Sequence, residues 1–171
     1  MASPQLVTAV NKSIGLVLAK TAGLVLAALL LSGCQVAAVQ SGRQLIHYAA
    51  FMRPALAQTT DLLQRQRTIV EREVREPLLV FDSGWRADVA DLAQDLTVLN
   101  ELALAYVPPA EAAELHASFL QALKLQLAGA TALRSFTETY SVSDFSPVLK
   151  QVDKAQKILP ELLSMLSALK N

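Results

Sequence analysis

The sequence contains little of what disulfide-stabilised or sheet-rich proteins use. It has one cysteine, six glycines and seven prolines in 171 residues, and aromatic residues make up 5% of the chain. A single cysteine excludes an intramolecular disulfide. The low glycine, proline and aromatic content favours helix over sheet, and neither strand-type alternation nor an Asn-Gly hairpin signal is present.

Excess charge is also lacking, because fifteen basic residues balance fifteen acidic ones. The chain therefore has no strongly basic surface for binding nucleic acid through phosphate contacts. It has no Gly-x-Ser-x-Gly, phosphate-binding loop or dinucleotide-binding glycine motif, and no base stands beside a candidate nucleophile. Hydrophobic residues make up 53% of the chain, which is too many for a disordered protein. These properties predict one folded domain that is not an enzyme.

The N-terminal segment has the organisation of a secretory signal. Residues 1–33 carry Lys12 and Lys20 but no acidic residue, and residues 22–31 form an uninterrupted apolar run. Small residues, Ser32 and Gly33, then precede Cys34. A positive segment, a short apolar segment and small residues before a cleavage point are the three parts of a signal peptide.

The run Leu31-Ser32-Gly33-Cys34 resembles the lipobox of bacterial lipoproteins. The resemblance implies cleavage between Gly33 and Cys34 and attachment of diacylglycerol to the Cys34 thiol. Two acyl chains are enough for a stable membrane anchor, because each buried methylene contributes about 0.8 kcal/mol. We therefore expect a signal peptide over residues 1–33, a lipidated tether over 34–54 and a bundle domain over 55–171. The alternative is an uncleaved membrane helix from about Leu6 to Leu31, with Lys20 reaching the interface.

Four segments beyond the tether have the spacing of amphipathic helices. We expect them at residues 55–75, 83–106, 109–140 and 145–169, with Glu76-Pro77 ending the first and Ser83 capping the second. The clearest apolar stripe has spacings of three and four residues: Trp85, Val89, Leu92, Leu96, Leu99, Ala103 and Tyr106. Pro160 is expected to kink the last helix. The predicted fold is all-α, an up-down-up-down four-helix bundle preceded by an N-terminal signal or anchor helix.

Residues 84–171 show a second, broader resemblance. Trp85 opens one helix, the run from Pro108 to His116 starts the next, and a short polar turn leads to a final amphipathic helix. These features look like those of uncharacterised bacterial secreted or lipid-anchored helical-bundle proteins. The resemblance implies a helical bundle and brings no activity and no site residues.

The two histidines give little support to a metal, haem or catalytic site. Bundle metal sites use Glu-x-x-His, but Ala113 occupies the position three before His116. His47 lies in the expected tether, and no Cys-x-x-Cys-His motif is present for haem attachment. A pair of haem ligands from His116 and Met165 is conceivable, although a methionine in a bundle is usually a packing residue. We predict no cofactor, no metal site and no catalytic residue.

Other polar and aromatic groups are interpreted structurally. Asp88, Asp91 and Asp95 recur one turn apart and are expected on a solvated face, where Asp88 and Asp95 could pair with arginines of the first helix. Trp85, Tyr106 and Phe119 occupy stripe positions and are expected to cap the core.

The sequence therefore predicts a non-catalytic interaction or scaffold module of the bacterial cell envelope. Acylated Cys34 would hold it to the extracytoplasmic side of a membrane, and its protein partner is unknown. The first helix has a weak apolar stripe, so its arginines Arg65, Arg67 and Arg72 are the predicted partner-binding face. The stripe consists of Leu56, Thr60, Leu63, Val70 and Val74. The alternative is a ligand-binding bundle, opened at Pro160, that holds a small apolar or cofactor ligand between its helices.

Overall fold

The computed structural model describes residues 41–169, apart from the side chains of Val142 and Asp144. The predicted signal peptide, the predicted cleavage point between Gly33 and Cys34, and the predicted lipidation of Cys34 lie outside the described residues, as does the first part of the predicted tether. The chain divides into two compact units, Met1–Arg43 and Gln44–Asn171. The second of these contains the folded domain.

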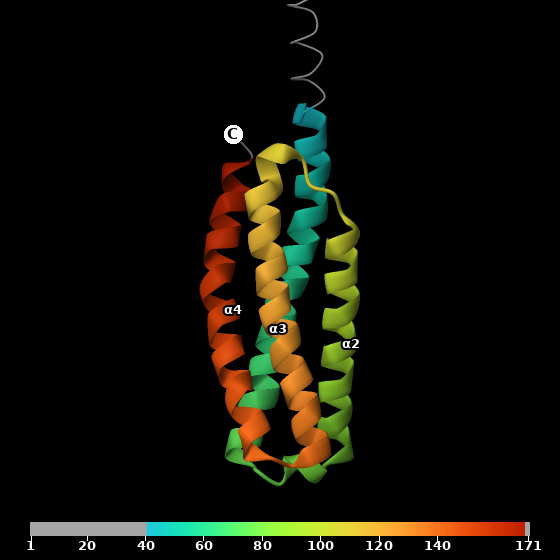
Figure 1. The fold of residues 1–171 in the computed structure, drawn as a ribbon, viewed down its shortest axis with the longest axis vertical. Helices are drawn as coiled ribbons and strands as arrows, with labels where there is room; N and C mark the ends of the chain where they lie inside the picture. The colour runs from blue at the N-terminus through green and yellow to red at the C-terminus, as the bar shows by residue number, and fades with distance from the viewer. Residues whose placement is uncertain (1–40, 170–171) are drawn as a thin grey trace, which may run out of the picture. The chain divides into compact units, whose positions relative to one another are not determined.

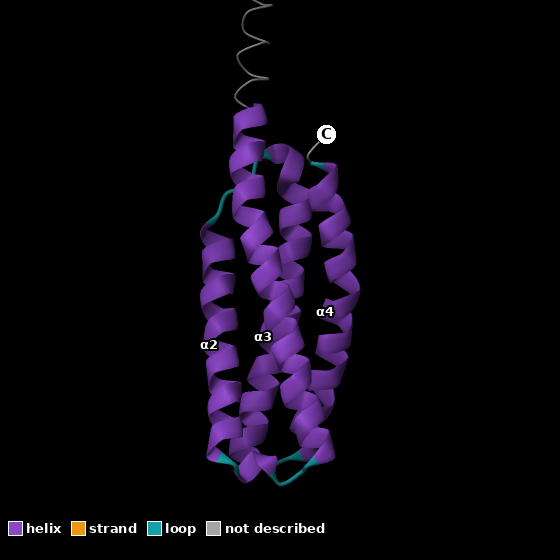
Figure 2. Ribbon diagram, turned by 180° about the vertical axis from the view of Figure 1, so that it is seen from behind, coloured by secondary structure: helices purple, strands orange, loops and turns teal. Residues whose placement is uncertain are grey.

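Residues 41–169 form an all-α, up-down-up-down four-helix bundle, which confirms the predicted fold class (Figures 1 and 2). The N-terminal helix (residues 41–75) is followed by a short 3₁₀ helix, η1 (Leu79–Phe81), and by α2 (Ser83–Ala105). A second 3₁₀ turn, η2 (Ala110–Ala112), leads into α3 (Ala113–Thr139), and α4 (Val142–Ala168) completes the bundle. Among these residues no helix is both long and apolar enough to cross a bilayer.

The core follows the three-and-four spacing seen in the sequence. In α2 the six stripe residues within the helix are all buried: Trp85, Val89, Leu92, Leu96, Leu99 and Ala103. In α4 the buried positions are Val148, Val152, Ala155, Leu159, Leu162 and Leu166. This spacing keeps one face of each helix turned to the others, which is the packing of antiparallel bundles.

The boundary predicted between tether and bundle is wrong. We expected the bundle to begin at residue 55, but the N-terminal helix is already formed at residue 41. Tyr48 and Met52 are completely buried in the core, so residues assigned to the tether contribute two of its largest side chains. The helix continues through Pro54, although this proline has no N–H to donate to the Ala50 carbonyl. Ala50 and Pro54 are both exposed, so water can bond to that carbonyl instead.

The start of α2 and the prolines of α4 also bear on the predictions. The N-cap of α2 is Asp82 rather than Ser83, since the Asp82 carboxylate accepts a hydrogen bond of 2.7 Å from the backbone N–H of Trp85. The fourth helix continues through both Pro147 and Pro160. Pro160 and Gln156, whose carbonyl it deprives of a donor, are both exposed, so water can replace the missing bond.

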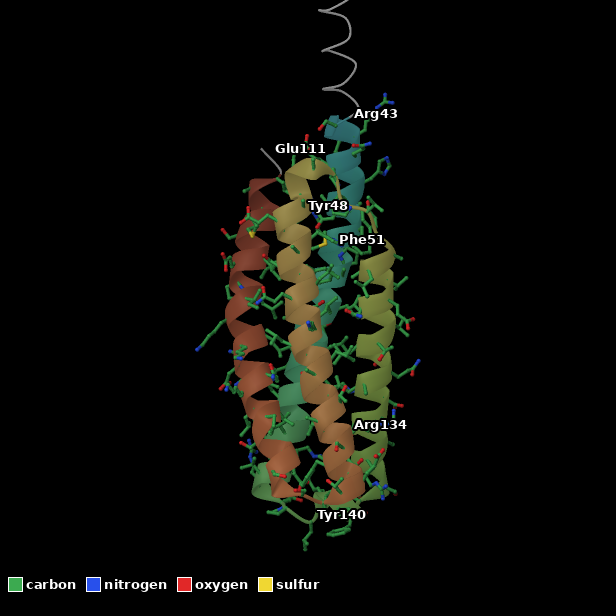
Figure 3. The ribbon with its side chains drawn as sticks, in the orientation of Figure 1. Arg43, Tyr48, Phe51, Glu111, Arg134 and Tyr140 are labelled. Carbon is green, nitrogen blue, oxygen red and sulfur yellow. The ribbon has the colours of Figure 1, made fainter. Side chains whose placement is uncertain are left out.

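The two ends of the bundle differ in chemistry, and we name them by a buried residue of each. The His116 end carries Tyr48, Phe51 and Tyr106, and the first two are labelled near one end of the bundle in Figure 3. The Glu73 end carries η1 and the turn at Tyr140, which Figure 3 places at the opposite end.

Candidate functional site

The three arginines predicted to bind a partner form contacts within the bundle. Arg65 pairs with Asp95 of α2 at 3.0 Å, and Arg72 pairs with Asp88 of the same helix at 3.5 Å. Arg67 instead donates to the Gln156 side chain of α4 at 3.1 Å. Pairing of Asp88 and Asp95 with arginines of the first helix is therefore confirmed.

The reason for choosing these arginines is contradicted by the structure. The prediction rested on a weak apolar stripe, but the N-terminal helix is as fully packed as the others. One row of buried positions recurs every four and three residues: Tyr48, Met52, Ala55, Thr59, Leu62, Gln66, Ile69 and Glu73. Leu56, Leu63 and Val70 are buried beside this row. The arginines flank this stripe on two sides, toward α2 and toward α4, so they do not form one uncommitted face.

His116 is part of a buried network at its end of the bundle. Its Nε2 lies 3.1 Å from the Ala103 carbonyl oxygen, which can only accept, so Nε2 carries the proton. Nδ1 then accepts from the Tyr48 hydroxyl at 3.3 Å. Burial lowers the pKa of His116 and raises that of Tyr48, which keeps both groups neutral in this network. Both ring nitrogens are thus engaged in holding the last turn of α2 to α3 and the N-terminal helix.

A layer of buried amides crosses the middle of the bundle. Gln66 Nε2 donates to the Gln126 carbonyl at 3.2 Å, and Gln126 Nε2 donates to the Thr59 carbonyl at 3.3 Å. Gly129 makes room for this layer, since a Cβ there would lie 2.6 Å from Gln66 Nε2. The side-chain oxygens of Gln66 and Gln126 have no protein partner. This layer ties the N-terminal helix to α3 at one register.

The strongest candidate site is a pocket at the Glu73 end, which we call the Glu73 pocket. Its volume is about 340 Å³, within the range of small-ligand sites. It lies between the end of the N-terminal helix, η1, the end of α3 and the start of α4. The lining residues are Glu73, Val74, Pro77, Val80, Phe81, Phe136, Tyr140 and Phe145.

Glu73 is the one ionisable carboxylate among these lining residues, and it is 4% exposed. The backbone N–H of Val80 donates to its carboxylate, but Oε2 has no hydrogen-bond partner. Burial raises the pKa of Glu73, and the Val80 bond only partly offsets this effect. A buried carboxylate oxygen without a partner carries a free-energy cost, because it has lost water and gained nothing in exchange.

An exposed aromatic pair forms the lip of the pocket. Phe81 is 63% exposed and Tyr140 is 45% exposed, and their rings stack with centroids 5.0 Å apart. Tyr140 adopts a left-handed backbone conformation, with φ of 55°, which is uncommon for a residue with a side chain. Inside the lip, Phe136 and Phe145 pack with centroids 5.2 Å apart. Tyr140 is the C-cap of α3, where its backbone N–H donates to the Phe136 carbonyl, so the end of this helix sets the position of the lip.

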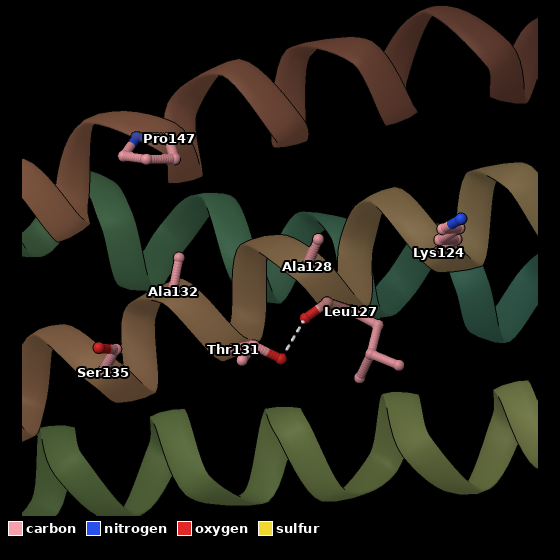
Figure 4. Close-up of a pocket in the computed structure, with 7 residues that line it drawn as sticks. All are labelled: Lys124, Leu127, Ala128, Thr131, Ala132, Ser135 and Pro147. Carbon is pink, nitrogen blue, oxygen red and sulfur yellow. Dashed lines mark hydrogen bonds between the residues drawn. The ribbon is translucent and has the colours of Figure 1, made fainter.

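A second hollow has less chemistry to offer. Figure 4 shows a groove beside α3, facing Pro147 of α4, with Lys124, Ala128 and Ala132 among the residues that line it. The Thr131 hydroxyl in this groove donates to the Leu127 carbonyl of its own helix at 2.8 Å. No carboxylate lines the groove, and its aliphatic walls are mainly small side chains. It is therefore a weaker candidate than the Glu73 pocket.

Sequence reasoning missed the Glu73 pocket, although one signal for it is present. Thr59, Gln66 and Glu73 recur every seven residues, and the same spacing places Met52 one repeat earlier. A polar residue repeated at a core position of a heptad marks a buried polar group. The other wall of the pocket comes from α3, and only the folded chain brings Phe136 to Glu73.

Residues 41–169 contain no group of three or more His, Cys, Asp or Glu side chains arranged to hold a metal ion. Comparison of the chain with protein-family models finds no matching family. Comparison with curated proteins and with solved structures finds no significant match either.

Proposed function

We propose that this chain is a bacterial lipoprotein whose helical bundle acts as a non-catalytic interaction or scaffold module outside the cytoplasm. The observation that carries the proposal is the sequence Leu31-Ser32-Gly33-Cys34 directly after an apolar run and two lysines. Acylated Cys34 would anchor the chain in the bilayer, and residues 35–40 would connect the anchor to the bundle.

The geometry of the bundle supports a non-catalytic role. His116, the first candidate for a general base, has both ring nitrogens bound in structural hydrogen bonds. Two aspartates of α2 pair with arginines of the N-terminal helix, Asp95 with Arg65 and Asp88 with Arg72. These groups stabilise the bundle and are not arranged around a common reacting centre.

Intact-mass analysis of the chain purified from its own bacterial host tests the anchor. We expect a polypeptide that begins at Cys34 and carries added acyl mass, and a Cys34→Ser variant that is released from membranes. A matched Ser32→Ala variant keeps small residues before the cleavage point and should remain acylated. A native chain that still begins at Met1 and has no added acyl mass contradicts the proposal.

The second candidate function is ligand binding, and the Glu73 pocket favours it specifically. The pocket combines an aromatic wall, an exposed aromatic lip and one unpartnered carboxylate oxygen. Its position differs from the one the sequence suggested, because it lies beside Phe145 at the start of α4 rather than at Pro160. Ligand binding and membrane anchoring are compatible, and each has its own test.

A further inference from the structure

The Glu73 pocket holds a buried carboxyl group for which the lining residues supply no basic partner. No lysine or arginine lines it. The two arginines nearest in sequence are already paired, Arg72 with Asp88 at 3.5 Å and Arg75 with Glu71 at 3.4 Å. The Val80 N–H serves the carboxylate but leaves Oε2 without a donor. A ligand that brings a positive charge and an N–H group would supply what is missing.

The aromatic lining of the pocket favours a ligand with an apolar body beside its ammonium group. Phe136 and Phe145 form an inner wall, and Phe81 and Tyr140 form the lip. Aromatic faces attract cations as well as apolar groups, so they suit a ligand that has both. A volume of about 340 Å³ is at the small end of ligand pockets and suits a small molecule rather than a peptide helix.

We propose that the Glu73 pocket binds a small protonated primary amine with an aromatic or branched apolar body. The ammonium group donates to the Glu73 carboxylate, whose Oε2 is covered in the free protein and is uncovered by a shift of the lining side chains on binding. The apolar body lies between the Phe136–Phe145 wall and the Phe81–Tyr140 lip. This inference rests on the ligand-binding function, the second candidate above, and does not depend on acylation of Cys34.

The left-handed backbone conformation of Tyr140 positions its ring in the lip of the pocket. With a φ of 55°, Tyr140 ends α3 and turns its ring onto Phe81. Both rings are substantially exposed, so the stack itself buries little apolar area. A ligand under the lip would cover more of these rings than the free protein does.

Calorimetric titration of the full chain in non-ionic detergent tests the proposal with two matched probes. Phenethylamine carries the ammonium group, and 2-phenylethanol has the same ring and chain length but no charge. We expect the amine to bind the unmodified chain about tenfold to a hundredfold more tightly than the alcohol, the usual effect of a buried charged hydrogen bond. Equal affinities for the two probes would overturn the assignment to amines, and this comparison requires no variant.

Two carboxylate variants then locate the charge. Glu73→Gln keeps the shape of the side chain and is expected to reduce amine affinity to that of the alcohol, with alcohol affinity unchanged. Glu71→Gln removes the same charge from an exposed position two residues away and should leave both affinities as they were. Amine binding that survives Glu73→Gln, or falls equally in Glu71→Gln, overturns the proposal.

A third variant separates failure of this inference from failure of the ligand-binding function. Phe81 is exposed, so Phe81→Ala should fold normally, and it is expected to weaken both probes severalfold. If Phe81→Ala weakens the binding of both probes and Glu73→Gln changes neither affinity, the bundle binds ligands but the assignment to amines is rejected. No binding of either probe at millimolar concentration would reject both.

Discussion

His116 is buried among aromatic rings, and its ring is held in the neutral form by the carbonyl of Ala103 and the hydroxyl of Tyr48. Sequence reasoning could state that a histidine at this position has no metal-binding spacing. It could not find Tyr48, which lies 68 residues away in a segment interpreted as a tether. The contact depends on the packing of two helix ends, which no local pattern contains.

Stability should fall as the solution is acidified below the ordinary histidine pKa. Burial lowers the folded pKa of His116 below its usual 6.5. Above that pH the ring is neutral in both states, and its full contribution to stability is present. Below it the unfolded chain binds a proton that the folded ring does not, so the free energy of unfolding falls by about 1.4 kcal/mol per unit of pKa difference.

Urea unfolding between about pH 7.5 and pH 5 measures this effect. We expect His116→Gln to lower stability by about 1–3 kcal/mol near neutral pH and to flatten the pH dependence. His47→Gln changes an exposed ring and should keep the slope of the unmodified chain. Glu73 contributes with the opposite sign, because its raised pKa means that ionisation costs stability as pH rises. The Glu73 contribution is present in the unmodified chain and in both histidine variants. If His116→Gln leaves the slope of stability against pH unchanged, His116 is not the source of the acid destabilisation.

At the scale of the element, the N-terminal helix shows where sequence pattern succeeds and fails. The stripe of α2 was predicted residue by residue because apolar side chains fill it. The N-terminal helix has the same spacing, but Thr59, Gln66 and Glu73 occupy buried positions where apolar residues were expected. Leu56, Leu63 and Val70 were recognised, whereas exposed Thr60 and Val74 were assigned to the stripe in error. Because these buried positions carry polar side chains, the sequence pattern indicated a surface helix where the structure has a core helix.

The register between this helix and α3 should depend on Gly129. In an exposed helix, Gly→Ala stabilises by up to about 1 kcal/mol through lower backbone entropy. At Gly129 the new Cβ would lie 2.6 Å from Gln66 Nε2, so the buried amide would have to move and lose its bond to Gln126. We expect Gly129→Ala to destabilise by about 1–3 kcal/mol in thermal or urea unfolding.

Two matched substitutions give this prediction its controls. A Cβ on Gly42 would meet nothing within 4 Å, so Gly42→Ala should be neutral or stabilising. In a Gln66→Ala background the obstacle is gone, and Gly129→Ala should become stabilising, which a double-mutant cycle detects. If Gly129→Ala and Gly42→Ala have the same effect in the unmodified chain, Gln66 does not fix the register.

For the whole molecule, the position of the domain boundary has the largest consequence. A chain of residues 41–171 retains Tyr48 and Met52, whereas a chain of residues 55–171 loses both from a core in which they are completely buried. Removing two such side chains costs more than about 5 kcal/mol, a large part of the stability of an ordinary domain. We expect the longer chain to unfold cooperatively and the shorter one to be largely unfolded by circular dichroism. Equal unfolding midpoints would restore the boundary at residue 55.

The overall architecture was predictable, and the candidate site was not. Helix number, direction and most of the core follow from spacing and from the prolines and polar turns that separate the helices. The Glu73 pocket requires Phe81, Phe136 and Phe145 to meet at one end of the bundle, and these residues belong to three separate segments. No local pattern in the sequence brings these three segments together.

Trp85 is the only tryptophan in the chain, and its ring packs edge-on against Phe136 with centroids 6.5 Å apart. Its indole N–H donates to the Ile69 carbonyl at 3.2 Å. Because Phe136 also lines the Glu73 pocket, the protein has a built-in fluorophore beside that pocket. Its emission wavelength and quenching can report events at this end of the bundle without an attached dye.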